Sequence, residues 1–206
     1  MKYSNNKFIY WVQTIPTRIK NFLFCLKYPF WRSRNVWTGK FTGYSCTWYD
    51  DIDEGWKKAF GKQLSDDIKA AFKEDKKKNP KLKWKDALYW HQIKEKWGSL
   101  CLYASATENI FNVLHYYEKI SDRYCFACGK PAHYMTRGYI LPLCEECFNR
   151  HNENNKKYFQ ENFANPNEEW EKYQQECLID EKNITPEKVE PLYKKERTIK
   201  NVRIKN

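Results

Sequence analysis

Four cysteines are the residues whose spacing predicts chemistry most directly. Cys125 and Cys128 form one Cys-x-x-Cys pair, and Cys144 and Cys147 form a second pair after 15 intervening residues. Two residues between cysteines allow both sulfur atoms to reach one tetrahedral ion, at Zn–S distances of about 2.3 Å. We therefore predict a zinc ribbon or treble-clef-like knuckle that holds Zn²⁺ through four thiolates. Four protein ligands leave no position for water or substrate, so the expected role of the zinc is structural.

Other interpretations of the cysteines fit less well. A single Cys-x-x-Cys pair can be a redox site, and iron–sulfur clusters also use thiolates, but two pairs at this distance match neither pattern. His133 and His151 could each replace one cysteine ligand. The remaining cysteines show no pairing pattern and are expected to be small buried apolar residues: Cys25, Cys46, Cys101 and Cys177.

A dense acidic run is the second candidate for chemistry. Its four carboxylates within five residues could hold a hard cation such as Mg²⁺ or Ca²⁺: Asp50, Asp51, Asp53 and Glu54. The spacing lacks the calcium-loop signature. The same residues could instead complement the positive end of a helix that follows them. With Lys94 or Lys96, the run would make a metal-dependent nuclease, and His91 is the best general acid–base candidate.

Motifs of the common enzyme classes are missing from the sequence. There is no phosphate-cradling glycine loop, no nucleophile elbow, and no His-Glu-x-x-His motif. The sequence therefore favours a protein that is not an enzyme.

The N-terminal region combines aromatic and basic residues. A period of three and four residues predicts a short amphipathic helix after Pro16 and before Pro29, with an apolar face of Ile19, Phe22, Leu23 and Leu26. We expect this face to pack on the rest of the fold. Stacking of the aromatic residues on unpaired bases, or a helix lying on a membrane surface, are the alternatives.

Further along the chain, the pattern predicts helices and a hairpin. We expect a loop over 36–62, a helix from Phe60 to about Lys76, and a strand over 100–103. Residues 88–94 are expected to be its hairpin partner, with a helix end as the alternative. A Ser105–Glu108 capping box should open the next helix. A short strand is expected over Tyr139–Leu141, and a helix from Cys147. Residues 151–181 read as helical with a break at Asn165-Pro166, and the chain from 183 onward reads as an extended tail.

These elements predict an α+β fold with a small antiparallel sheet, helices, a four-cysteine zinc ribbon or knuckle, and a helical C-terminal extension. We divide the chain into a basic aromatic arm over 1–40, an α+β core with the knuckle over 41–150, and a helical extension with a basic tail over 151–206.

The charge of the chain is concentrated at its ends. The 206 residues carry a net charge of +11, and residues 1–45 contain eight Lys or Arg and no Asp or Glu. Basic termini suggest a polyanionic partner, although such surfaces also arise in proteins of AT-rich genomes. The residues expected to bind nucleic acid or another partner are Lys20, Lys27, Arg32, Arg34, Lys40, Lys194, Lys195 and Arg197.

The most apolar N-terminal stretch is too interrupted by charges and prolines to span a membrane, and no signal-peptide pattern follows it. We therefore expect a cytoplasmic protein without a membrane partner. In that compartment the cysteines are thiols or metal ligands and not disulfides.

Several motifs resemble a group of small uncharacterised bacteriophage and prophage proteins. They are Gly55–Gly61, Gln92–Leu100, Tyr117–Ser121, the Cys125-x-x-Cys128-Gly-Lys-Pro segment and the second cysteine pair. The likeness covers about residues 48–148 and implies a zinc-knuckle domain. Of the functional residues, it carries over the four cysteines alone. The chain departs from the group at Ser99 and Cys101, where the group more often has Gly and Arg.

This resemblance and the charge pattern together lead to the functional prediction. We expect a non-enzymatic phage-type zinc protein that engages a host protein, a ribonucleoprotein, RNA or DNA in the host cytoplasm. One concrete form, by analogy with genome context, is an inhibitor of a host defence such as an RNA-guided nuclease. The alternatives are a sequence-independent nucleic-acid-binding protein of phage replication or transcription, the metal-dependent nuclease described above, and a virion component.

Overall fold

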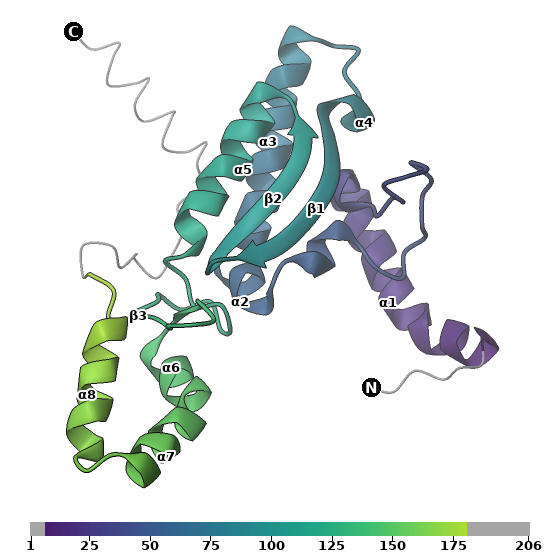
Figure 1. The fold of residues 1–206 in the computed structure, drawn as a ribbon. Helices are drawn as coiled ribbons and strands as arrows, with labels where there is room; N and C mark the ends of the chain where they lie inside the picture. The colour runs from purple at the N-terminus through teal and green to yellow at the C-terminus, as the bar shows by residue number, and fades with distance from the viewer. Residues whose placement is uncertain (1–6, 181–206) are drawn as a thin grey trace, which may run out of the picture.

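The computed structural model describes residues 7–180, with their side chains from Thr14 onward. The expected α+β class is confirmed (Figure 1). The elements follow in the order α1 (Lys7–Lys27), η1 (Pro29–Trp31), η2 (Trp48–Asp51), α2 (Glu54–Trp56), η3 (Lys57–Gly61), α3 (Lys62–Lys78), α4 (Trp84–Ala87), β1 (Leu88–Lys96), β2 (Ser99–Ala106), α5 (Glu108–Ser121), β3 (Tyr134–Met135), β4 (Pro142–Leu143), α6 (Glu145–His151), α7 (Glu153–Asn162) and α8 (Pro166–Cys177).

The hairpin of β1 and β2 is the largest sheet among the described residues. Its strands are antiparallel and joined by Trp97 and Gly98, which have φ angles of 56° and 77°. Two successive positive φ angles are typical of the tight turn whose twist matches that of a hairpin. The predicted strands over 88–94 and 100–103 are therefore confirmed, and each extends a few residues further.

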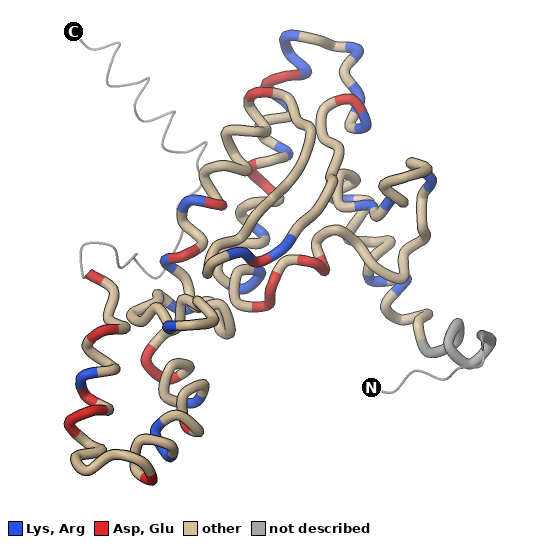
Figure 2. The backbone as a smooth tube through the Cα atoms, viewed as in Figure 1, with Lys and Arg blue, Asp and Glu red and all other residues tan. Residues whose placement is uncertain are grey.

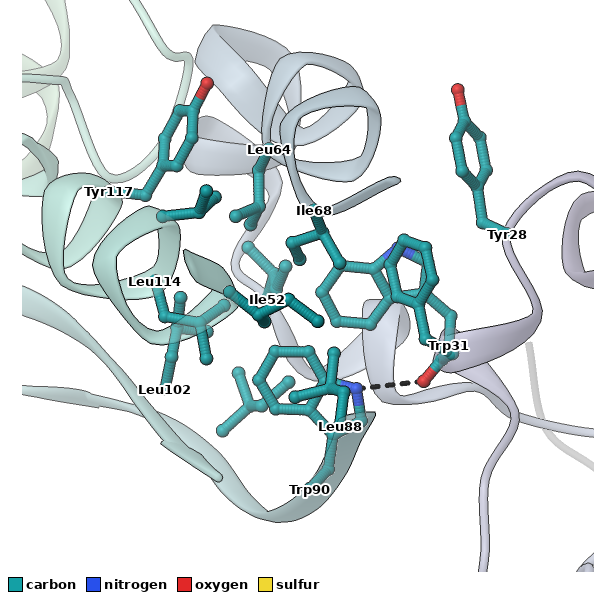
Figure 3. Close-up of a cluster of buried hydrophobic side chains, with 14 of the residues drawn as sticks. Tyr28, Trp31, Ile52, Leu64, Ile68, Leu88, Trp90, Leu102, Leu114 and Tyr117 are labelled. Atoms are coloured by element: carbon teal, nitrogen blue, oxygen red, sulfur yellow. Dashed lines mark hydrogen bonds between the residues drawn. The ribbon is translucent and has the colours of Figure 1, made fainter. Parts of the chain in front are cut away.

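Two long helices cover one face of this hairpin. Figure 1 shows α3 and α5 side by side behind β1 and β2, and both α3–α5 and α5–β2 are in extensive contact. The apolar periods of the two helices, from Leu64 to Phe72 and from Ile110 to Ile120, face this contact and are buried. Figure 3 shows the resulting cluster, to which Ile52 from the preceding loop also contributes.

An aromatic layer extends the core toward the N-terminus. Trp31 and Trp90 are stacked, with ring centroids 4.9 Å apart and planes 6° apart (Figure 3). Both indole N–H groups are satisfied. Trp31 Nε1 donates to Ser65 Oγ at 3.0 Å, and Trp90 Nε1 donates to the carbonyl oxygen of Phe30 at 2.9 Å. Tyr28, Phe30 and Trp31 are thus part of the main core, although they lie within the segment assigned to the arm.

Side chains of α5 bind the outer edge of β2. The backbone N–H of Leu100 donates to Ser121 Oγ at 2.9 Å, and that of Leu102 donates to Glu118 Oε1 at 2.6 Å. A two-stranded sheet leaves an edge with unpaired N–H groups, which would cost free energy if they were buried without partners. Glu118 and Ser121 therefore complete a sheet that has no third strand at this edge.

The first helix differs from the expectation in two ways. It begins at Lys7 and continues through Pro16, although an interior proline removes one hydrogen bond and commonly kinks or ends a helix. Its predicted apolar face is not buried against the fold, although Phe22 contacts the ring of Tyr44. Ile19, Phe22, Leu23 and Leu26 are 42–58% exposed, and the helix buries Thr14, Asn21 and Cys25 instead. Asn21 Nδ2 donates to the carbonyl oxygen of Tyr44 at 3.0 Å.

Three local predictions were wrong. The predicted 36–62 loop contains η2, α2 and the π-helical turn η3. The expected capping box at Ser105 is absent, because β2 continues through Ala106 and Thr107 is the N-cap of α5. A capping box is found instead at the start of η2, between Thr47 and Asp50. The short strands near the zinc site are β3 and β4, on either side of the predicted 139–141.

The C-terminal part forms a second, smaller core with the cysteines. Helices α6, α7 and α8 lie at one end of the molecule, beyond the hairpin tip (Figure 1). Phe148 and Trp170 are buried there, and the rings of Tyr134 and Phe148 are stacked with centroids 4.2 Å apart. The predicted break at Asn165-Pro166 is confirmed, since Pro166 opens α8. The predicted tail from 183 onward lies outside the described residues. We call residues 125–179 the zinc module.

No helix among residues 7–180 has both the length and the apolar character needed to cross a membrane.

Candidate metal centre and basic face

The first cysteine pair sits in a tight knuckle turn. The backbone N–H of Cys125 donates to Lys130 O at 2.7 Å, and the N–H of Gly129 donates back to Cys125 O at 2.9 Å. Gly129 has a φ of 81°, in the left-handed region that favours glycine. The sequence Cys-x-x-Cys-Gly therefore supplies both the ligands and the residue that lets the chain turn around them.

The second pair stands at the start of a helix. Cys144 is the N-cap of α6 and Cys147 lies in the first turn, so the expected helix begins two residues earlier than predicted. The preceding strand β4 pairs with β3, and the N–H of Phe126 donates to Pro142 O at 2.8 Å. This short sheet brings the second pair against the first.

The four sulfur atoms form one cluster. All lie within 4.8 Å of one another, and Cys128 Sγ is 3.5 Å from Cys144 Sγ. A tetrahedral ion with Zn–S distances of about 2.3 Å requires sulfur atoms about 3.8 Å apart. Three of the cysteines are buried and Cys128 is half-buried. The donor set, the spacing and the burial therefore fit a structural zinc ion, as the sequence predicted.

The environment of the thiols also favours a cation. Burial raises the pKa of the Cys125 thiol, but hydrogen bonds from backbone N–H groups outweigh burial and hold this pKa below its ordinary value. The pKa of Cys147 is raised, by burial first and then by its thiol neighbours. Four thiolates this close repel one another, and a divalent ion removes that penalty. With four sulfur ligands a bound ion would have no open position for water or substrate, so its contribution would be to the stability of the fold.

Backbone contact between two glycines joins the zinc knuckle to the main core. The N–H of Gly55 donates to Phe126 O at 3.0 Å, and a Cβ on Gly129 would lie 2.5 Å from Gly55 O. The indole N–H of Trp56 donates to Ser121 O at 2.8 Å, and its ring meets that of Phe126 edge to face. The Gly-Trp motif of residues 55–56 and the Cys-x-x-Cys-Gly motif are thus two sides of one interface.

The acidic residues of the predicted cation site make local contacts near their own turn and helix starts. Asp50 Oδ2 accepts hydrogen bonds from the N–H and the hydroxyl of Thr47 at 2.7 and 2.9 Å. Asp53 is the N-cap of α2, and Glu54 pairs with Lys57 at 3.1 Å, a hydrogen bond that lowers the pKa of the Glu54 carboxyl. Among the residues that the structure describes, the four cysteines are the group with converging metal-ligand atoms. The helix-capping interpretation fits this geometry, and the nuclease alternative gains no support from it.

The other predicted candidates are dispersed. His91 is exposed on β1, with Nε2 2.8 Å from Ser105 Oγ. His133 and His151 are exposed and do not join the cysteine cluster. Cys25 and Cys177 are buried as expected, whereas Cys101 is half-buried and Cys46 is exposed, against the expectation.

The predicted partner-binding residues separate into two groups. Arg32, Arg34 and Lys40 lie together on the loop after η1. The backbone of Arg32 forms an isolated antiparallel β-bridge with Thr47, and that of Arg34 forms one with Phe41. Lys20 and Lys27 project from α1, and Lys27 lies over the ring of Tyr28. Figure 2 shows basic residues on this loop and on the α3–α4 connector, and acidic residues along α8. The predicted Lys194, Lys195 and Arg197 lie outside the described residues.

The structure places further residues beside Arg32 and Arg34 that the sequence analysis did not predict as partner-binding residues. Trp84, Lys85 and Tyr89 lie about fifty residues after the basic loop, yet they line one pocket with Arg32 and Arg34. No local pattern signals this, because the contact depends on how α4 and β1 pack beside η1. The one available signal was the basic and aromatic composition of the stretch from Lys81 to Trp90.

Comparison of the chain with protein-family models, curated proteins and solved structures finds no match. The resemblance to phage proteins therefore stays a prediction.

Proposed function

We propose that this chain is a zinc-stabilised binding protein, not an enzyme, and that it engages a nucleoprotein complex through one face. This N-terminal face consists of α1 from Arg18 onward and the loop to Tyr44. The observation that carries the proposal is that one segment, residues 18–44, carries both exposed apolar side chains and six Lys or Arg, with no Asp or Glu within the segment itself.

The apolar part of the N-terminal face runs from the helix into the loop. The rings of Phe22 and Tyr44 have centroids 5.2 Å apart, and those of Tyr44 and Phe41 are 4.8 Å apart. Together they connect the exposed stripe of α1 to the loop tip, where Trp37 is 91% exposed. Continuous exposed apolar surface of this kind marks a site where another protein binds.

The charged part of the same face suits a polyanion. Residues 18–44 carry Arg18, Lys20, Lys27, Arg32, Arg34 and Lys40 and contain no Asp or Glu. Basic surface supplies the salt-dependent, sequence-independent part of nucleic-acid binding. The apolar surface is suited to binding a protein, and the cationic residues are suited to binding a nucleic acid. A nucleoprotein complex contains both kinds of partner.

The finer form of the proposal comes from the resemblance to phage proteins. On that resemblance the complex belongs to a host cell, and an RNA-guided nuclease of host defence is one such complex. The chain would then act by occupying a surface of the complex, and its zinc would serve the fold of the inhibitor.

An affinity capture from host lysate tests the proposal, with and without nuclease treatment of the lysate. One variant carries Arg34→Glu with Lys40→Glu, and a second carries Leu23→Gln with Leu26→Gln. All four side chains are exposed, so both variants should fold. The matched control reverses two exposed lysines of the zinc module, Lys157→Glu with Lys172→Glu.

A nucleoprotein partner requires both parts of the face. We expect one stoichiometric complex with the wild type and the control, and at least a tenfold loss with either N-terminal variant. Loss with the charge variant alone, together with sensitivity to nuclease, would instead mean a free nucleic-acid binder. Capture that is unchanged in both variants would overturn the proposal, and so would Mg²⁺-dependent cleavage of nucleic acid by the purified chain.

A further inference from the structure

A pocket opens where the basic loop meets the start of the hairpin. It has a volume of about 260 Å³ and lies between η1, the loop after it, α4 and the first residues of β1. Pockets for small molecules typically range from roughly 300 to 1,000 Å³, so this one suits a single planar group with a small substituent. The residues that give it chemical character are Arg32, Arg34, Trp48, Trp84, Lys85 and Tyr89.

The polar groups of the pocket are cationic. Arg32, Arg34 and Lys85 line it, and no carboxylate is among the lining residues. Arg32 Nε is buried and has no hydrogen-bond partner among the described residues. Buried donors are normally paired, and the pairing of this N–H is not completed by the described residues. Arg34 Nη1 donates to Gly39 O at 3.3 Å, which holds this guanidinium across the loop.

The apolar walls of the pocket are aromatic rings held by neighbouring rings and by the loop. Trp84 contacts two rings: it stacks on Phe72 of α3, with centroids 3.7 Å and planes 16° apart, and the tilted ring of Phe30 lies 4.7 Å away. The Tyr89 hydroxyl donates to Val36 O at 3.4 Å and ties β1 to the loop. Half-buried aromatic rings that are already held in place can stack on a planar ligand with little loss of side-chain freedom.

Positive charge continues beyond the pocket. Exposed lysines lie at the end of α3 (Lys73, Lys76, Lys77 and Lys78), on the connector (Lys81 and Lys83) and on α4 (Lys85, which lines the pocket). Lys77 pairs with Glu74. Figure 2 shows basic residues along this part of the backbone. On the other side lie Arg34 and Lys40 of the loop. A pocket that binds one small anion does not need positive charge beyond its walls. A site for a single strand does, because the phosphates on either side of the bound nucleotide also need cations.

We propose that this pocket binds one unpaired nucleotide of a single-stranded nucleic acid. The base would lie against the Trp84 and Tyr89 rings, and its phosphate would accept hydrogen bonds from the Arg32 and Arg34 guanidinium groups. The flanking strand would follow the lysines of the connector. The inference rests on the proposed function and names the nucleic-acid element that the N-terminal face recognises.

Binding of fluorescent oligonucleotides to the full-length zinc-loaded protein tests the inference. The probes are a ten-nucleotide single strand, the same strand in a duplex, the 5′-mononucleotide, and a phosphotyrosine peptide. The variants are Arg34→Ala and Lys85→Ala. The matched control is Lys172→Ala, because Lys172 is an exposed lysine of α8 that neither lines the pocket nor lies on the proposed path of the strand. A single strand that carries 5-iodouracil is photo-crosslinked to the protein, and the crosslinked residue shows where the base binds.

We expect the single strand to bind at least tenfold more tightly than the duplex and the mononucleotide. Arg34→Ala and Lys85→Ala should each weaken it at least fivefold, and Lys172→Ala less than twofold. The crosslink should map to Trp84 or Tyr89. The inference is overturned if Lys172→Ala costs as much as Lys85→Ala, if the duplex binds equally well, or if the phosphopeptide binds best.

The two proposals fail separately. If the pocket variants leave strand binding unchanged while the charge-reversed face still loses the host complex, the pocket inference is wrong and the proposed function stands. If the strand binds in the pocket but no host complex depends on the face, the proposed nucleoprotein partner is wrong, and the chain is a nucleic-acid-binding protein.

Discussion

Gly55 and Gly129 set how closely the zinc knuckle approaches the main core. We predict that Gly55→Ala destabilises the protein by at least about 2–3 kcal/mol, as overpacking of a tight contact does. The new Cβ would lie 2.2 Å from the carbonyl oxygens of both Cys125 and Phe126, and neither backbone group can move without disturbing the knuckle. Chemical denaturation of wild type and variant measures the difference.

Gly138→Ala is the control for this prediction. Gly138 has a φ of 82°, but a Cβ there meets nothing within 4 Å. Only backbone strain remains, about 1–2 kcal/mol. If Gly55→Ala proved no worse than Gly138→Ala, the glycine contact would not be what holds the two parts together.

Asp122 provides a prediction that depends on pH. It follows the C-terminus of α5, its Oδ1 is buried without a hydrogen-bond partner in the described chain, and burial raises the pKa of its carboxyl. A raised pKa in the folded state means that ionisation costs stability, and this cost is fully present only above that pKa. The negative charge also lies at the wrong end of the helix dipole.

We therefore expect Asp122→Asn to stabilise the protein at neutral pH by on the order of 1 kcal/mol. The advantage should shrink as the pH falls through the raised pKa, because the wild-type carboxyl then becomes neutral as well. Thermal melts of both proteins at matched pH values measure it. A variant that is less stable at neutral pH, or an advantage independent of pH, would show that the charge of Asp122 is satisfied in the folded protein.

At the level of elements, the zinc module should depend on its ion and the main core should not. Zinc sites of four thiolates supply about 10–16 kcal/mol of apparent binding energy at neutral pH. The module's own core is small, with Phe148 and Trp170 as its large buried side chains, and a separate cluster fills the hairpin and α3. We predict that a chelator removes hydrogen-exchange protection from residues 125–177 and leaves β1, β2, α3 and α5 protected.

Two cysteine variants serve as controls for zinc removal. Cys128→Ser should reproduce the effect of the chelator, and Cys46→Ser, at an exposed cysteine outside the cluster, should not. Loss of protection throughout the chain would mean that the two cores fold as one unit, and no loss would mean that the thiols alone hold the module.

The sequence predicted those elements whose patterns are local and failed where tertiary contact decides. The cysteine spacing and the hairpin are local, and both were found. The apolar stripe of α1 has a clear helical period, yet it is exposed, because Asn21 and Cys25 make the contact with the fold. Periodicity finds an amphipathic helix, but it does not say whether the partner of its apolar face is the same chain.

On the scale of the whole molecule, the pocket is the feature that sequence reasoning could not reach. Arg32 and Arg34 were predicted as partner-binding residues from charge alone. Their aromatic and basic neighbours Trp84, Lys85 and Tyr89 come from another part of the chain, and only the packing of α4 beside η1 brings them together. The zinc module lies at the other end of the hairpin, so it stabilises the fold without taking part in this face (Figure 1).

The salt dependence of binding tests the central claim, that the N-terminal face binds a nucleic acid, most directly. For single strands the slope of log K against log salt concentration is about −0.7 for each phosphate that is neutralised. With one phosphate held by Arg32 and Arg34 and a neighbouring phosphate held by Lys85, we predict a slope of about −1.4 or steeper, and a slope shallower by about 0.7 for Lys85→Ala. A slope near zero, or one that Lys85→Ala leaves unchanged, would contradict the account.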